Sequence, residues 1–274
     1  MVSSPPSLNL PTLAPGWDWQ TWQGMPYLTC SLLENWHHGF FTRQFWPRTP
    51  EEFVAILQPD AEVYRLKQVH GNQVLTPQEI NTALAQDSEA SLVPGDGIVN
   101  EQAHQAVWVA TADCTPVLIG DIHTGQVAAI HAGWRGTAKK IVPEAIKRLV
   151  AHGSSTQDLR IAMGPAISGE VYQVSEQVGA EVGATVISNA ESISIEDILA
   201  QLQELSDAPI LQDSEPGKVR LDVRRINALQ IEQLGISVEQ VTIAPICTYQ
   251  QPDYLFSYRR RREKKVQWSG IVSN

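Results

Sequence analysis

The sequence predicts an α/β (α+β) protein with a single layered domain, in which helices flank mixed β-sheets. Short β-like runs of uneven spacing alternate with stretches in which apolar residues recur at helical spacing. The chain of 274 residues is 43% hydrophobic, which is enough to bury a sizeable core. We therefore expect one domain over residues 21–274, preceded by a flexible Pro-rich arm over residues 1–20.

In the first half of the chain, turn residues separate the expected strands. Gly, Pro, Asn and Asp supply the backbone angles of tight turns, so clusters of them mark the ends of strands. Pro50 at the start of an apolar run predicts a short helix over residues 50–58. A polar loop is expected over residues 81–95. The β-like runs cover residues 27–41 (two strands), 63–69, 73–76, 97–100, 106–111, 116–121 and 127–130.

The second half is predicted to contain more helix. The first of its helices is expected to start at Thr137 as N-cap and to end at Gly153, because apolar residues recur at helical spacing between them. Helical patterning returns over residues 175–206 and 222–234, and Pro216–Gly217 marks a turn. Strands are expected at residues 160–163, 241–244, 256–262 and 266–271.

Composition limits the partners that this protein can have. The net charge of −10 and the pI near 5.1 do not favour a nucleic-acid surface, which is normally basic. No apolar stretch is long enough to span a bilayer, and the N-terminus lacks the pattern of a signal peptide. The three cysteines form no CxxC motif, which favours a reducing compartment. We expect a cytoplasmic protein without nucleic-acid or membrane partners, for which a monomer is compatible with the sequence.

Three residues with metal-ligating side chains stand at the edges of β-like runs. They are His70, Cys114 and His131. Thiolate and imidazole ligands together suit zinc, and three protein ligands are typical of catalytic rather than structural zinc sites. The wide spacing of the three residues matches no local zinc motif, however. Buried core residues, or a metal-free Cys–His nucleophile pair, explain the same residues as well.

Neighbouring residues suggest how a substrate could be held. Arg43 and Arg135 are candidates to bind phosphate, because a guanidinium group matches phosphate in bidentate geometry. Gln68 lies two residues before His70, so on a strand it shares the face of that residue and could touch substrate. Asp113 would point to the face opposite Cys114, which favours a structural role. The arginine run at residues 259–262 is typical of a solvated loop.

Several segments resemble the signature of the YfiH/laccase-domain family. Its members were first called multicopper polyphenol oxidoreductases and later purine nucleoside phosphorylases. The three segments that resemble it most closely hold the candidate ligands and are Lys67–Gly71, Thr111–Pro116 and His131–Gly136. Further matches in family order are Thr42–Arg43, Gly95–Gly97, Met163–Ile167, Val171–Tyr172, Cys247–Thr248 and Phe256–Arg260. The chain departs from the family pattern after Arg43 and at residues 166–170, which leaves the substrate preference open.

The resemblance implies a fold, a cofactor and an activity. It implies a catalytic domain with a core similar to that of cytotoxic necrotizing factors, and Zn²⁺ held by His70, Cys114 and His131. Besides the three ligands, we expect a catalytic role for Arg43. The implied reactions are phosphorolysis of adenosine, inosine, guanosine and methylthioadenosine, with adenosine deamination as a second activity. Nucleoside and phosphate would be the small-molecule partners.

Three other functions compete with this interpretation. A zinc-dependent hydrolase of cell-wall precursors would use the same metal. A copper polyphenol oxidase is the older label, but it needs several His-rich copper sites, and only two of the seven histidines lie in the signature segments. Copper is therefore the less favoured metal. A non-catalytic binding module would need a closed zinc site, for which no fourth ligand is evident.

Overall fold

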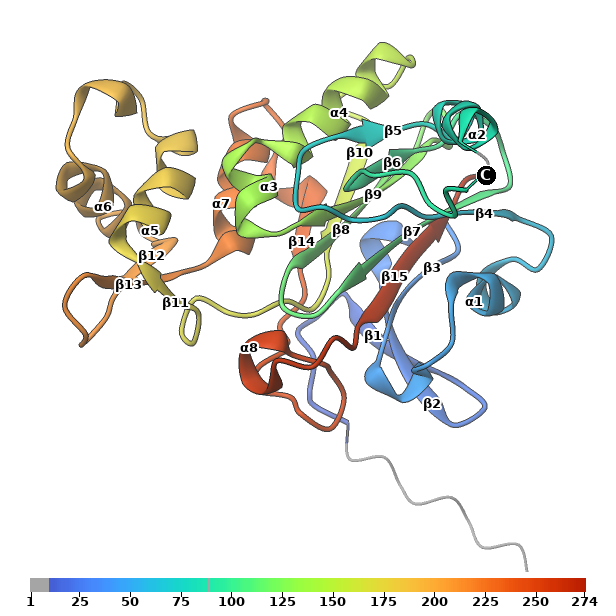
Figure 1. Cartoon of the computed structure of the whole chain (residues 1–274), viewed down its shortest axis with the longest axis horizontal. Helices are drawn as coiled ribbons and strands as arrows, with labels where there is room; N and C mark the ends of the chain where they lie inside the picture. The colour runs from blue at the N-terminus through green and yellow to red at the C-terminus, as the bar shows by residue number, and fades with distance from the viewer. Residues whose placement is uncertain (1–9, 88) are drawn as a thin grey trace, which may run out of the picture.

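The protein is built from two six-stranded sheets that pack against each other and a small third sheet at one end of the molecule (Figure 1). The computed structural model describes residues 10–87 and 89–274. Each of the two large sheets contains both antiparallel and parallel pairs, such as β15–β7 and β4–β7 in the first. The predicted class, mixed sheets flanked by helices in an α/β fold, is confirmed.

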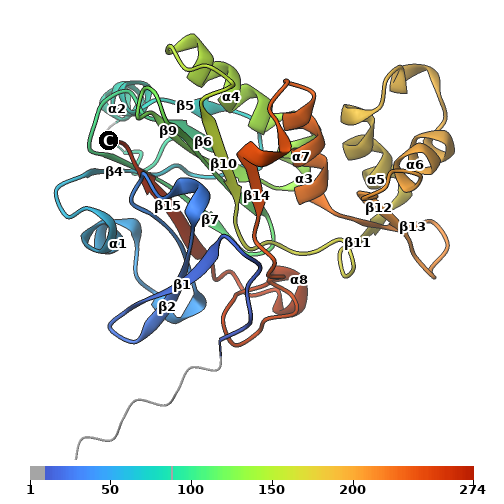
Figure 2. The ribbon, with the colours of Figure 1, turned by 180° about the vertical axis from the view of Figure 1, so that it is seen from behind.

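The strand order of the first sheet is β1-β2-β3-β15-β7-β4. Its strands are β1 (Trp17–Trp22), β2 (Met25–Cys30), β3 (His38–Phe41), β15 (Gln267–Val272), β7 (Gln105–Thr111) and β4 (Glu62–Tyr64). The order of the second sheet is β14-β10-β8-β9-β6-β5. Its strands are β14 (Val241–Ile243), β10 (Leu159–Met163), β8 (Thr115–Asp121), β9 (Val127–Ala132), β6 (Gly97–Val99) and β5 (Val74–Leu75). Figure 2 shows β10 and β14 side by side at the back of the molecule.

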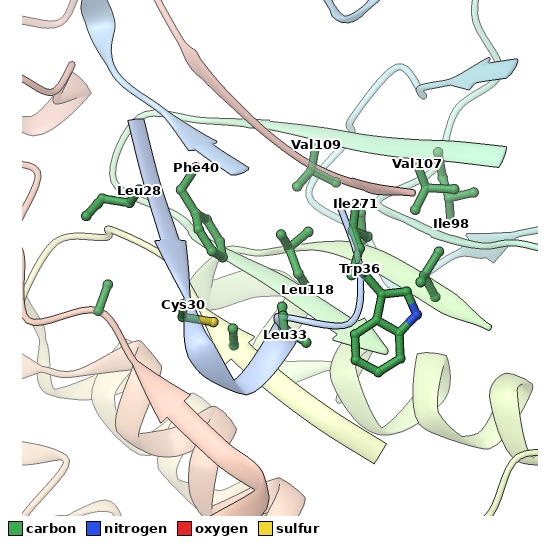
Figure 3. Close-up of a cluster of buried hydrophobic side chains, with 14 of the residues drawn as sticks. Leu28, Cys30, Leu33, Trp36, Phe40, Ile98, Val107, Val109, Leu118 and Ile271 are labelled. Atoms are coloured by element: carbon green, nitrogen blue, oxygen red, sulfur yellow. The ribbon is translucent and has the colours of Figure 1, made fainter. Parts of the chain in front are cut away.

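The main core lies between the facing sides of these two sheets. Phe40, Val109 and Ile271 of the first sheet point toward Leu118 and Ile98 of the second (Figure 3). All five side chains are almost completely buried. Burying an aliphatic or aromatic side chain of this size contributes about 1.5–3 kcal/mol, so this layer holds the two sheets in a defined relative position.

Helices cover the outer faces of the sheets. On the second sheet, α4 (Ile141–Ala151) packs its apolar face, including Ile146, against the strands, and α7 (Val223–Glu232) adds Ile231. On the first sheet, α1 (Pro50–Leu57) inserts Phe53 beside Phe41 and Trp108. Short elements complete this part of the fold: α2 (Pro77–Gln86), α3 (Trp134–Ala138), α8 (Tyr258–Arg261), and the 3-10 turns η1 (Ser31–Leu33), η2 (Arg43–Phe45) and η5 (Val238–Gln240).

The third sheet forms a satellite unit with its own small core. Its strand order is β11-β13-β12, and α5 and α6 pack against it (Figure 1). The elements are β11 (Gln173–Ser175), α5 (Glu176–Gly183), η3 (Ala184–Val186), η4 (Ala190–Ser192), α6 (Ile195–Gln203), β12 (Ile210–Gln212) and β13 (Lys218–Leu221). Trp134 and Tyr172 pack against the edge of this core, so the unit reaches the segments that follow His131.

Several sequence predictions need correction. Residues 17–20, which were expected to belong to the N-terminal arm, are part of β1, and β1 pairs with β2. Residues 1–9 lie outside the described part of the chain, and the domain boundary itself stays a prediction. Part of the loop expected over residues 81–95 is the end of α2, which starts with a capping box between Thr76 and Glu79.

Two further elements differ in their local structure. Thr137 lies inside α3 and is hydrogen-bonded to Asn227 of α7, so it does not cap the long helix. That helix, α4, begins after Lys140, whose left-handed backbone separates it from α3. The strand expected over residues 256–262 is instead the short helix α8, capped by the Ser257 hydroxyl, which accepts from the backbone N–H of Arg260. Among the described residues, no helix has the length and apolar character needed to cross a bilayer.

Candidate metal centre

Two neighbouring strands of the second sheet bring Cys114 and His131 together. The hairpin register places Pro116 opposite His131 and Thr115 opposite Ala132, so Cys114, one residue before β8, lies beside the end of β9. His70 arrives from the segment between β4 and β5, where the chain crosses from the first sheet to the second. The ligand atoms of the three side chains all lie within 4.8 Å of one another.

The crossing segment contains an unusual backbone angle at the candidate ligand itself. The sequence suggested that Gly71 and Asn72 would supply the turn, but the residue in the left-handed region is His70, with φ of 58°. Such a conformation is uncommon for residues other than glycine and persists where the surroundings enforce it.

Asp96 holds the His70 backbone in this conformation and also orients the His131 ring. Its fully buried carboxylate accepts hydrogen bonds from the backbone N–H of His70 (2.9 Å) and of Gly71 (2.7 Å). The same carboxylate lies 2.8 Å from Nδ1 of His131. A carboxylate that binds one imidazole nitrogen leaves the other, Nε2, to coordinate a metal. One buried side chain therefore positions two of the three candidate ligands.

Gly133 is required for the close approach of the three side chains. A Cβ atom at this position would lie 2.8 Å from the sulfur of Cys114 and 3.5 Å from the His70 ring. The first distance is too short for two non-bonded atoms, so any side chain here would displace the thiol. Glycine at the turn between β9 and α3 thus belongs to the site.

The electrostatics of the cluster favour a thiolate. Burial alone would raise the pKa of the Cys114 thiol, but the charges and hydrogen bonds of His131 and His70 lower it to about 6. Burial likewise opposes the charge of His131, but the thiolate and Asp96 raise its pKa to about 9. For Asp96, the hydrogen bonds of His131 and Gly71 outweigh burial and keep its pKa below the ordinary value. Without metal, a thiolate–imidazolium pair results, and metal binding would release the imidazolium proton.

This donor set fits a transition metal. A thiolate and two imidazoles are the ligands that zinc prefers, and they suit copper as well, so the donor types alone do not select between the two. Within residues 10–87 and 89–274, the cluster contains three metal-ligating side chains and is the one group of its kind. Three protein ligands are typical of zinc sites at which chemistry takes place.

Asp113, next to Cys114, ties the site to the C-terminal segment. Its buried carboxylate accepts hydrogen bonds of 2.7 Å from the Thr248 hydroxyl and from the backbone N–H of Arg259. Its backbone has φ of 102°. Burial raises the pKa of Asp113. The structural role expected for this residue agrees with these contacts, although it arises from a strained loop and not from strand alternation.

The other predicted site residues have different surroundings. The Gln68 amide makes two hydrogen bonds of 2.7 Å with the backbone of Ala110, which fasten the His70 segment to β7. A contact between Gln68 and substrate stays a prediction. Arg135 is exposed and lies 4.3 Å from the centre of the Trp134 ring. Arg43 packs on Phe256 and donates to the Pro252 carbonyl, so its described contacts are with the C-terminal segment and not with the three candidate ligands.

Sequence reasoning did not assign a site role to Asp96 or Gly133. Both lie in segments that match the family signature. For Asp96, a usable signal was an acidic residue between two glycines directly before a buried strand. Nothing in the sequence alone indicates that its carboxylate reaches the backbone of residues 70 and 71.

The chain is similar to a family model and to several curated proteins that share one name. The family model described as multi-copper polyphenol oxidoreductase laccase matches residues 50–272. A protein of Synechocystis named purine nucleoside phosphorylase is 53% identical over 94% of this chain and 97% of its own length. A protein of the same name from Mycobacterium tuberculosis is 33% identical over 76% of this chain and 70% of its own length.

Two solved structures share the fold. YlmD of Geobacillus stearothermophilus superposes with a TM-score of 0.74 at 23% identity, covering 93% of this chain and 98% of its own. The hypothetical protein YfiH of Bacillus licheniformis gives a TM-score of 0.72 at 22% identity, covering 90% and 96%. Both agree with the resemblance expected from the sequence segments.

Proposed function

The chain belongs to the family described as multi-copper polyphenol oxidoreductase laccase, and from this premise we propose that it is a zinc-dependent purine nucleoside phosphorylase. The observation that carries the proposal is the convergence of His70, Cys114 and His131 within 4.8 Å. The reaction is taken from the name shared by the curated relatives. The proposed substrates are adenosine, inosine, guanosine and methylthioadenosine, with adenosine deamination as a second activity.

The three ligands would hold the metal at the boundary between the interior and the surface, because His131 is buried, Cys114 is half-buried and His70 is exposed. A metal bound there supplies a Lewis acid beside the substrate. The chain's own residues set the geometry: Asp96 fixes the orientation of His131 and the backbone at His70, and Gly133 leaves room for the Cys114 sulfur. Placing the groups in advance lowers the entropic cost of reaching the transition state.

Phosphorolysis also requires an anion next to the sugar. Phosphate oxygen forms a bond to the anomeric carbon of ribose while the bond from that carbon to the purine nitrogen breaks, and the released base takes up a proton. Arg135 is proposed to bind the phosphate, since its exposed guanidinium makes no described ion pair and stands four residues after His131. In a protein with net charge −10, such a local cation is needed to attract an anion.

Zinc is proposed over copper because the described residues contain one ligand cluster. A multicopper oxidase needs several copper sites to pass electrons, whereas the part of the chain that the structure describes offers the single group of His70, Cys114 and His131. The competing hydrolase of cell-wall precursors would use the same cluster, so it is distinguished by substrate and not by metal.

The test is chromatography of adenosine after incubation with purified, zinc-loaded protein, with and without phosphate. His131→Ala is compared with His123→Ala, whose side chain is exposed in the turn between β8 and β9. We expect adenine in the presence of phosphate and inosine in its absence, both lost in His131→Ala and retained in His123→Ala. Unchanged turnover in a folded His131→Ala protein would overturn the proposal. If the folded, zinc-containing wild type gives no product, the result would favour the competing function, hydrolysis of cell-wall precursors.

A further inference from the structure

The arginine run at residues 259–262 lies beside the metal centre and not in a remote loop. The backbone N–H of Arg259 donates to Asp113, the residue before Cys114, and its Nη1 donates to the Gln173 carbonyl at 2.7 Å. Through these contacts α8 touches both the loop that carries Cys114 and β11 of the third sheet. A charged side chain at this junction therefore stands near the proposed reaction site.

The arginines of this run do different things. Arg260 donates to the carbonyls of Thr248, Tyr249 and Leu255, at 2.6–2.7 Å, so it holds the loop together. Arg261 is exposed and reaches Glu263 at 4.0 Å. Arg259 instead lies over the Tyr172 ring, 4.7 Å from its centre. In the described part of the chain, its guanidinium makes one hydrogen bond, to Gln173, and no ion pair within 4.0 Å, which leaves most of its N–H groups for a ligand.

Tyr172 connects this arginine with the metal ligands. Its pKa is raised to about 12 by burial, and then by the charges of Cys114 and Asp113, whereas Arg259 and Arg135 act to lower it. Tyr172 therefore keeps its proton and is available as a hydrogen-bond donor. Tyr172 and Trp134 also pack against the same core of the third sheet, and Arg259 and Arg135 lie over these two rings.

We propose that Arg259, supported by the Tyr172 ring, forms with Arg135 an oxyanion subsite that binds inorganic phosphate beside the metal ligands. A guanidinium offers paired N–H groups that match two oxygens of a phosphate, and stacking on an aromatic ring reduces the freedom lost on binding. Two arginines can balance the charge of a phosphate dianion. The inference rests on the proposed phosphorylase function for the identity of the anion, but its binding can be measured without turnover.

Asp113 determines where this guanidinium stands. The same carboxylate accepts from the Arg259 backbone and is joined through the chain to Cys114. The Ile167 N–H donates to the Asp113 carbonyl at 3.0 Å and holds the loop from the other side. The distance between the proposed anion subsite and the metal ligand is thus set by a short, buried connection and not by a flexible loop.

The subsite is tested by isothermal titration of inorganic phosphate into the zinc-loaded wild type and three variants. Arg259→Ala removes the cation, Arg259→Lys keeps charge without the paired donors, and Arg261→Ala is the matched control on the same helix. We expect phosphate binding to weaken about tenfold to a hundredfold in Arg259→Ala, less in Arg259→Lys, and less than about twofold in Arg261→Ala. Thermal unfolding of each variant verifies that the fold is retained.

Steady-state kinetics separates this inference from the proposed function. Arg259→Ala is expected to raise the KM for phosphate while leaving the KM for nucleoside within about twofold. If wild type binds phosphate through Arg259 but does not cleave nucleosides, the subsite stands and the phosphorylase proposal fails. If wild type cleaves nucleosides and folded Arg259→Ala keeps the wild-type affinity and KM for phosphate, the subsite is overturned. Absence of phosphate binding to wild type would overturn it as well.

Discussion

Replacing Asp96 by Asn would test whether one buried carboxylate organises the metal centre. The change keeps the size of the side chain but removes its charge and turns one acceptor into a donor. One carboxylate oxygen accepts from His70 N–H and lies next to the His131 ring, and the other accepts from Gly71 N–H at 2.7 Å. The single oxygen of an Asn amide can accept hydrogen bonds on one of these two sides only. On the other side the NH2 group would face a backbone N–H, so the hydrogen bond there is lost.

The magnitude follows from the contacts that are lost. A hydrogen bond to a charged group contributes about 1.5–3 kcal/mol, and about 1.4 kcal/mol corresponds to a factor of ten in affinity. Asp96→Asn would remove one such hydrogen bond at the His70 segment and would orient His131 less tightly. We therefore expect the affinity for zinc to fall about tenfold to a hundredfold. This range agrees with the usual effect of changing a residue that hydrogen-bonds to a metal ligand.

Competition with a chromophoric zinc chelator measures the change directly. Asp121→Asn is the matched control, because Asp121 is also fully buried and accepts from two backbone N–H groups, of His123 and Thr124, at the far end of the same hairpin. We expect the control to lower the thermal midpoint and leave zinc affinity unchanged. Zinc affinity of Asp96→Asn within twofold of the wild type would refute the reasoning.

Two other predictions follow from local geometry and charge. Gly133→Ala places a Cβ atom 2.8 Å from the Cys114 sulfur, so we expect the zinc content after dialysis to fall well below one ion per chain. Gly153→Ala is the control, because nothing lies within 4 Å of a Cβ atom there. Its φ of 102° strains an alanine, so this variant should lose stability but keep its metal. The hydrogen bond of Arg148 lowers the pKa of Glu79 from its ordinary value of 4.5. The stabilisation from this ion pair is therefore fully present above the ordinary pKa of 4.5, and it is lost as the pH falls through the lowered pKa of Glu79 in the folded protein. Because both side chains are partly exposed, Glu79→Gln should lower the free energy of unfolding by less than about 1 kcal/mol at neutral pH and by less still in acid. Urea titration at the two pH values measures this difference. A larger loss in acid than at neutral pH would contradict the expected pH dependence.

Apolar patterning predicted the elements whose burial is one-sided or complete. Helix α1 and strands β7 to β9 follow it because each buries a continuous apolar face. Helix α2 does not: of its residues only Pro77 and Ile80 are buried, so capping at Thr76 and its neighbours define it more than periodicity does. The Phe256–Arg262 segment has strand-like residues, but both neighbours of β15 are already taken by β3 and β7. No strand partner is left for it there, and Ser257 starts a helix instead.

The sequence by itself determined which residue types could hold a metal, because the thiol of Cys114 and the imidazoles of His70 and His131 carry that chemistry wherever they lie. It also determined the fold class and the family, through local patterns and short ordered motifs. Only the tertiary structure decided that these three side chains meet and that Asp96 hydrogen-bonds to the ring of one and to the backbone of another. It also decided that Arg259 lies over the Tyr172 ring, while Arg260 binds loop carbonyls. These contacts join residues far apart along the chain, and strand register and the path of the connecting segments bring them together. Local sequence spacing carries no information about either.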